Sequence, residues 1–300
     1  MAKKQKDSKH GQGTSTGGTA APDEGPFSDA LSVGPGFLLR EVDPEATPGF
    51  SGSKKDGERA LEEDSGEVGD WQERLFAESK GGGTRSLLLV IQGMDTSGKG
   101  GIMRHVFAAV DPEGIRTTAF KAPTPEERRH GFLWRVRNAL PGPGKLGVFD
   151  RSHYEDVLIV RVHDFVPQVV WTKRYAEINA FEREVVTAGT EVVKVMLHIS
   201  KDEQRARLAR RLRRPDKHYK YNPGDVAERE RWEDYMQAYQ VALTRCSTKA
   251  APWHVVPANK KWYARYAVQQ LLLERLRAMD PQWPDMGLDV EAERARLAAS

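Results

Sequence analysis

The stretch GMDTSGKGG, residues 93–101, has the Gly-x-x-x-x-Gly-Lys spacing of a phosphate-binding loop. Such a loop surrounds phosphate oxygens with backbone N–H groups, and its lysine adds a point charge. The next position usually holds a Ser or Thr whose hydroxyl helps to bind Mg²⁺, but here it is glycine. Either the match is accidental and Lys99 lies on an exposed turn, or another group binds the metal. If the loop binds phosphate, we expect contacts from Gly93, Ser97, Gly98, Gly100 and Gly101.

Two aspartates are candidates for that metal. Asp95 lies inside the loop, where a carboxylate would repel phosphate unless a cation lay between them. Asp150 ends the apolar stretch LGVFD, and parallel sheets bind ligands beyond the carboxyl ends of their strands. The alternative for Asp150 is an N-cap of a following helix, which DRSHYEDV allows. We expect Asp95 and Asp150 to bind Mg²⁺.

Strands and helices alternate around these residues. A short apolar run predicts a strand over 86–92, and further strands are predicted over 114–120, 145–150, 191–200 and 253–258. The intervening patterns predict helices over 102–110, 125–140, 173–189 and 261–279. This alternation indicates an α/β fold with three layers, α/β/α, around a parallel sheet. The glycine loop would lie between a buried strand and a helix, which favours phosphate binding over an exposed turn.

Composition divides the chain into four parts. Residues 1–36 are rich in small and polar residues and are expected to be a disordered tail. Residues 37–84 form an extension whose stretch 70–79 has apolar residues at helical spacing. A core over 85–285 and a charged tail over 286–300 complete the chain. A hydrophobic fraction of 39% can supply a core. The single cysteine (Cys246) and the lack of a long apolar run favour a cytoplasmic protein that does not bind membranes.

Positive charge is concentrated in residues 201–220, which hold nine Lys or Arg and three acidic residues. A helix through this stretch places Arg207, Arg211 and Arg214 at i, i+4 and i+7, as one cationic stripe. Such a stripe can be a solvated surface. Uncompensated like charges at this spacing, however, destabilise a helix, and a bound polyanion would relieve their repulsion.

Three stretches together resemble the family-2 polyphosphate kinases. GMDTSGKGG, FDRSHYEDVLIVRVH and PDKHYKYNPGDVAERERWEDYMQAY match the family's loop, second aspartate motif and lid. FKAPTPEERRHGFLWR and APWHVVPANKKWYARYA also match, so the similarity runs from about residue 37 to 285. The polyphosphate:nucleotide phosphotransferases are the branch that the chain resembles most. One departure is Tyr219, where many members have Trp.

The resemblance implies a thymidylate-kinase-like P-loop core with a helical lid over about 201–235. It implies Mg²⁺-dependent phosphoryl transfer between inorganic polyphosphate and a nucleotide, with AMP, ADP and GDP all left open. Asp95 and Asp150 would be essential, and Lys99 and Arg151 would contact phosphate. The lid residues expected to bind polyphosphate are Arg207, Arg211, Lys217 and Lys220. The residues expected beside the acceptor nucleotide are Lys121, Pro123, Thr124, Glu126 and Arg135. A homo-oligomer, dimer or tetramer, is also expected.

Three alternatives remain open. A phosphohistidine intermediate would use His153, but a packing role suits this residue better, and we expect direct transfer. An ATP-dependent nucleoside monophosphate kinase would share the core, although the cationic lid and Gly100 count against it. A nucleic-acid-binding module would need aromatic residues between its cations, and residues 201–214 contain none. We therefore do not expect nucleic acid as a partner.

Overall fold

The computed structural model describes residues 25–300 and contains a sheet of five parallel strands. The strands are β1 (Ser86–Gln92), β2 (Ile115–Ala119), β3 (Leu146–Asp150), β4 (Thr190–His198) and β5 (Trp253–Pro257). All five strands were predicted from the sequence. Every residue of β1 is buried, as expected for a central strand covered on both faces.

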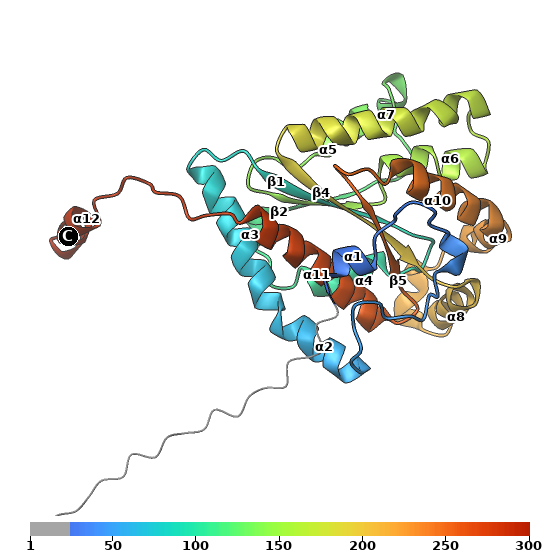
Figure 1. Ribbon diagram of the computed structural model, residues 1–300, viewed down its shortest axis with the longest axis horizontal. Helices are drawn as coiled ribbons and strands as arrows, with labels where there is room; N and C mark the ends of the chain where they lie inside the picture. Colours follow the sequence, from blue (N-terminus) through green and yellow to red (C-terminus); the bar gives the residue numbers. More distant parts are fainter. Residues whose placement is uncertain (1–24) are drawn as a thin grey trace, which may run out of the picture.

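Helices cover both faces of the sheet (Figure 1). One face carries α1 (Phe27–Ala30), α2 (Lys54–Glu63), α3 (Ser65–Lys80), α4 (Lys99–Val106) and α11 (Lys261–Met279). The other face carries α5 (Trp134–Ala139), α6 (Ile159–Val162), α7 (Gln168–Thr187) and α10 (Trp232–Cys246). The three-layer α/β/α prediction is confirmed. None of the helices in the described part of the chain combines the length and apolarity of a membrane span.

The strand order β2-β3-β1-β4-β5 creates a switch point at β1. The chain leaves β1 toward β2 and β3 on one side, and later returns to β4 on its other side. Ligands of open parallel sheets bind where connections diverge in this way. Ile91 pairs with Asp150 in register, so the loop after β1 and the residues after β3 are neighbours.

The lid segment, defined here as residues 201–235, lies at this edge of the sheet (Figure 1). It contains α8 (Lys201–Leu212), the 3-10 helix Pro215–Lys220, α9 (Gly224–Glu230) and the start of α10. Ser200 caps α8 by accepting a hydrogen bond of 3.1 Å from the Glu203 N–H. The cap fixes where the helix starts, directly after β4.

The expected single helix over 125–140 is wrong in its first half. Residues 127–129 form a 3-10 turn, and α5 begins only at Trp134. Thr124 and Glu127 bond reciprocally, since each backbone N–H donates to the other's side chain at 2.8 and 3.2 Å. The backbone then becomes extended at His130, before Gly131. This closed turn followed by glycine interrupts the helical pattern.

The disordered tail expected over 1–36 is wrong for residues 25–36, while residues 1–24 lie outside the described residues. Phe27, Leu31 and Val33 are buried against the core, and Glu274 accepts hydrogen bonds from the N–H groups of Phe27 and Ser28 at 2.6 and 2.9 Å. Burying three apolar side chains, each worth about 1.5–3 kcal/mol, offsets the entropy of ordering.

The helix predicted in the N-terminal extension is present, and the predicted C-terminal tail contains a helix of its own. The helix expected over 70–79 lies within α3, whose residue Leu75 is buried. The charged tail expected over 286–300 contains α12 (Val290–Ala298), which is exposed and lies away from the rest of the molecule (Figure 1).

Candidate active site

Backbone geometry explains the glycines of the phosphate-binding loop. Gly93 and Gly98 have φ angles of +151° and +121°, and a Cβ on Gly93 would lie 2.7 Å from the Leu197 carbonyl oxygen. α4 begins at Lys99, earlier than the expected residue 102. Gly98 has no side chain to cap that helix, so the amides of its first residues, Lys99 and Gly100, are available for an anion. Lys99 Nζ donates to the Gly93 carbonyl at 2.8 Å, across the loop.

The two predicted aspartates lie at adjacent strand ends. Asp150 Oδ1 is buried and has no hydrogen-bond partner among the described residues. The N-cap alternative for Asp150 is excluded, because Ser152 caps the 3-10 helix that follows by accepting from the Tyr154 N–H at 3.2 Å. Asp95 Oδ1 accepts a hydrogen bond of 3.0 Å from Arg151 Nη2. The structure therefore brings Asp95, Lys99, Asp150 and Arg151 together at one edge of the sheet.

Charged groups around this edge shift one another's pKa. Burial lowers the pKa of Lys99, although the Asp150 and Asp95 carboxylates oppose that shift. Burial also favours the neutral form of Arg151, but Glu155 and Asp95 raise its pKa. Burial raises the pKa of Glu155, against the effect of Arg151 and Lys99. Glu155 was not predicted, although it lies in the same motif as Asp150, five residues further along the chain.

A cavity of about 630 Å³ joins the loop to the lid segment and is strongly cationic. Its lining includes the predicted Arg207, Arg211, Lys217 and Lys220. It also includes four cations that were not predicted: Arg104, Arg210, Lys261 and Arg265. Arg104 lies on α4, and Lys261 and Arg265 lie on α11, so these residues reach the cavity from elements distant in sequence.

The expectation of an uncompensated stripe on α8 is wrong. Arg207 is only 4% exposed and pairs with Glu203 at 2.6 Å. Arg211 pairs with Asp225 at 3.5 Å, and its Nη1 donates to the Lys220 carbonyl at 2.8 Å. The third arginine of the stripe, Arg214, also has an acidic partner, Asp216, at 2.8 Å. Glu203 lies four residues before Arg207, so helical spacing could have revealed this partner, whereas Asp225 comes from α9 and could not be found in this way.

A second cavity, of about 350 Å³, lies beside β2. Its lining includes Lys121, Thr124 and Arg135, but not Pro123 or Glu126. Arg135 Nη1 donates to the Lys121 carbonyl at 2.8 Å, and its guanidinium lies 5.4 Å from the centre of the Phe120 ring. The predicted acceptor residues are therefore only partly gathered, and Arg135 holds the backbone of Lys121.

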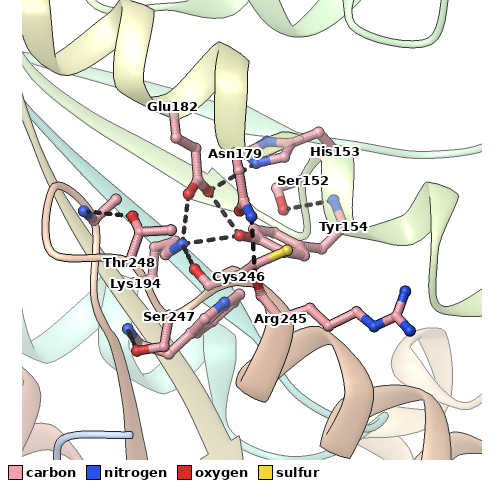
Figure 2. A network of polar contacts seen from close by, with 12 residues as sticks. Ser152, His153, Tyr154, Asn179, Glu182, Lys194, Arg245, Cys246, Ser247 and Thr248 are labelled. Carbon is pink, nitrogen blue, oxygen red and sulfur yellow. Dashed lines mark hydrogen bonds and ion pairs between the residues drawn. The ribbon is translucent and has the colours of Figure 1, made fainter. Parts of the chain in front are cut away.

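His153 belongs to a buried polar network that is separate from the cavity lining (Figure 2). Its Nε2 lies 3.2 Å from Glu182 Oε1, and the residue is 1% exposed. Lys194 Nζ donates to Glu182 at 2.5 Å, to the Tyr154 hydroxyl at 2.9 Å and to the Cys246 carbonyl at 2.7 Å. Cys246 is buried in this network.

Comparisons with known proteins agree with the motifs. The family model described as Polyphosphate kinase 2 matches residues 51–284. An AMP/ADP-polyphosphate phosphotransferase of Meiothermus ruber is 45% identical over 83% of this chain and 91% of its own length. An ADP-polyphosphate phosphotransferase of Rhodopseudomonas palustris is 38% identical over 82% of this chain and 86% of its own.

A solved structure gives the same result for the fold. The crystal structure of polyphosphate kinase 2 from Arthrobacter aurescens TC1 superposes with a TM-score of 0.90 at 55% sequence identity. The match covers 92% of this chain and 98% of that chain. Sequence motifs, family match and fold agree over most of the chain, and it therefore belongs to the polyphosphate kinase 2 family.

Proposed function

We propose that this protein transfers phosphoryl groups directly between inorganic polyphosphate and a nucleoside mono- or diphosphate, with Mg²⁺. The main observation is the cationic cavity of about 630 Å³, in which the phosphate-binding loop, Asp95, Asp150 and the lid segment meet. The names of the Meiothermus and Rhodopseudomonas relatives support AMP and ADP as acceptors. GDP remains a third candidate.

Phosphoryl transfer needs positioning and charge neutralisation more than covalent chemistry. In the proposed reaction, the loop amides and Lys99 hold the transferring group. Arg151 faces the same edge and neutralises charge that develops on the phosphate oxygens. Cavity-lining lid cations such as Arg210 and Lys217 bind the rest of the polyphosphate chain, where their charges offset its closely spaced negative charges.

The residues present fit a magnesium ion. No cluster of three or more His, Cys, Asp or Glu within residues 25–300 could bind a metal alone. Mg²⁺ commonly binds through one or two carboxylates, with phosphates and water as its other ligands. Asp150 Oδ1, buried and unpartnered among the described residues, supplies one such ligand, and Asp95 a second. When bound, the ion would supply positive charge that offsets the negative charge of the phosphate groups.

Direct transfer is supported by the surroundings of His153. Its imidazole is buried and faces Glu182, and it is not part of the cavity lining. A phosphohistidine would need His153 to leave this network. Incubation with polyphosphate alone should therefore give no acid-labile phosphoenzyme, and stoichiometric trapping of one would contradict direct transfer.

A donor comparison tests the proposed function. Purified protein with Mg²⁺ receives either polyphosphate or ATP as donor, and AMP, ADP or GDP as acceptor. Formation of ATP from ADP or ADP from AMP with polyphosphate alone supports the proposal. Activity with ATP only would instead identify a nucleoside monophosphate kinase, while retention of nucleic acid without transfer would favour the binding-module alternative.

The expected homo-oligomer is also proposed. Phe165 and Val169, at the junction of α6 and α7, are 63% and 64% exposed, and exposed apolar side chains of one segment are candidates for a contact between subunits. Light scattering coupled to size-exclusion chromatography would distinguish monomer, dimer and tetramer.

A further inference from the structure

Helix α8 directs two long polar side chains at the phosphate-binding loop. Gln204 is 1% exposed and Arg207 is 4% exposed. Residues of these types are rarely so deeply buried unless their polar groups are paired. Their partners therefore show what the two side chains do.

The partners include three consecutive carbonyl groups of the loop. Gln204 Nε2 donates to the Asp95 carbonyl at 3.0 Å. Arg207 Nη1 donates to the carbonyls of Thr96 and Ser97 at 2.9 and 2.8 Å. Two residues on adjacent turns of α8 thus bind three consecutive carbonyl oxygens of the loop.

This arrangement orients the loop amides. In a planar trans peptide the carbonyl and N–H groups point in opposite directions. Carbonyls turned toward α8 therefore direct the N–H groups of Thr96 and Gly98 away from α8, and both residues line the cavity. Thr96 has a φ angle of +66°, a conformation that persists in non-glycine residues only where the surroundings enforce it.

Arg207 uses its full hydrogen-bonding capacity in this role. A guanidinium has five N–H donors, and Nε donates to Glu203 Oε1 at 2.6 Å. Besides the two loop carbonyls, Nη2 donates at 2.6 and 3.0 Å to the carbonyls of Ala258 and Asn259, which follow β5. All five donors are engaged, so none is left for a phosphate group.

Gln204 is itself held by the lid segment. Arg229 Nη1, on α9, donates to Gln204 Oε1 at 2.8 Å and to the Lys201 carbonyl at 2.7 Å. The side-chain amide of Gln204 therefore connects α9 to the loop. A site whose supporting contacts are fixed in this way keeps its donors within the narrow tolerance that catalysis requires.

We propose that Gln204 and Arg207 are positioning residues that set the phosphate-binding loop, and that Arg207 does not contact polyphosphate. The activity readout of this proposal rests on the proposed function. Loop mobility gives a second readout that needs no substrate, so failure of one proposal can be distinguished from failure of the other.

Arg207→Lys separates positioning from charge. Lysine keeps the positive charge but cannot reproduce the planar, five-donor arrangement. We expect kcat to fall by about 10- to 100-fold, as for a small misplacement of reacting groups, with the KM for polyphosphate within about two-fold of wild type. Arg205→Lys, which changes an exposed cation of the same helix that does not line the cavity, is the matched comparison and should leave kcat nearly unchanged.

Gln204→Met tests the same idea without any charge. It should lower kcat while leaving the KM for polyphosphate and its salt dependence unchanged. Hydrogen–deuterium exchange of a peptide covering residues 93–101, in substrate-free protein, should become faster in Arg207→Lys and Gln204→Met but not in Arg205→Lys, which alters the exposed side of α8. Assays at temperatures well below each variant's Tm remove the effect of global unfolding.

Two results would overturn the proposal. One is an Arg207→Lys protein with wild-type kcat and loop exchange, beside an Arg207→Gln protein that raises only the KM for polyphosphate. The other is unchanged loop exchange in both Arg207→Lys and Gln204→Met. If wild-type protein lacked transferase activity, faster loop exchange in these variants would still support the positioning role.

Discussion

Arg151 Nη2 donates a hydrogen bond of 3.0 Å to Asp95 Oδ1, which joins the phosphate-binding loop to the residue after β3. Arg151 has a φ angle of +64°, uncommon for a residue with a side chain. Such conformations concentrate at functional sites, where the surroundings enforce them. In the proposed reaction, Asp95 therefore has two roles, since it orients Arg151 and binds Mg²⁺.

The first prediction concerns the two carboxylates. Asp95→Asn and Asp150→Asn keep side-chain size but remove the charge that would bind the metal. Because Gly100 offers no hydroxyl, each change should lower kcat by about 100-fold or more, as when one electrostatic stabiliser is lost. Turnover is measured over a Mg²⁺ titration, since a weakened metal site also shifts the Mg²⁺ requirement upward.

Asp111→Asn is the control for charge and size. Asp111 lies before β2, and its Oδ1 accepts a hydrogen bond from the Glu113 N–H, which asparagine can also do. Its activity and metal requirement should match wild type. An Asp95 or Asp150 variant with normal turnover and an unchanged Mg²⁺ requirement would show that the carboxylate does not bind the ion.

The second prediction is a pH dependence. Partial desolvation, together with the guanidinium groups of Arg207 and Arg210, lowers the pKa of Lys261 to about 8, although its side chain reaches solvent. Polyphosphate binds the charged form better, so its KM should be low below pH 8 and rise as the pH increases through this value. An exposed ionic contact contributes up to about 1 kcal/mol, or about five-fold in KM.

Lys261→Arg identifies the group responsible. Arginine stays charged throughout this range, so the rise in KM around pH 8 should disappear in the variant. The KM for polyphosphate is measured at several pH values with the nucleotide saturating. An identical pH profile in both proteins would mean that another group causes the change.

The sequence predicted the parts of the fold and site that depend on local pattern. Five strands follow from alternating strand and helix patterns, and the glycine loop follows from spacing. Asp150 could be placed because strand ends of a parallel sheet share one edge. The boundary of the disordered tail was wrong because the composition was averaged over 36 residues. This average concealed three apolar residues that pack against the core, Phe27, Leu31 and Val33.

Features that depend on packing between distant segments could not be predicted. Arg104 and Arg265 reach the cavity only because α4 and α11 pack together. Arg207 has the same helical spacing as Arg211, yet it is buried against backbone carbonyls while Arg211 faces Asp225. The way in which α8 packs against the rest of the molecule therefore sets the different roles of Arg207 and Arg211. The helical periodicity of the sequence carries no information on this packing.

The third prediction concerns stability. Lys194 and Glu182 form a fully buried ion pair, and Lys194 together with His153 lowers the pKa of Glu182 although burial alone would raise it. Lys194→Met leaves Glu182 buried without its main partner and should reduce the free energy of unfolding by about 3–5 kcal/mol. Urea unfolding at neutral pH measures the loss.

The double variant Lys194→Met/Glu182→Gln tests whether the instability comes from the lost ion pair itself or from the unpaired buried carboxylate of Glu182. The glutamine carbonyl can still accept from the Tyr154 hydroxyl, so most of the stability should return. Because the pKa of Glu182 is lowered on folding, the pair's contribution is complete above the ordinary glutamate pKa and is lost as pH falls through the lowered one. A double variant as unstable as Lys194→Met would contradict this account.

The fourth prediction concerns the lid and separates a polyanion channel from a solvated surface. Arg210 and Lys217 line the cavity, whereas Arg205 and Arg213 are exposed cations of the same segment that do not line it. Arg210→Gln/Lys217→Gln and Arg205→Gln/Arg213→Gln therefore remove the same charge from the same segment. Only the first pair should raise the KM for long polyphosphate and flatten its dependence on salt, since fewer counterions are displaced on binding.

Initial rates against polyphosphate concentration at two salt levels measure both effects. Equal kinetics in the two double variants would mean that overall charge, rather than a lid channel, attracts the polyphosphate.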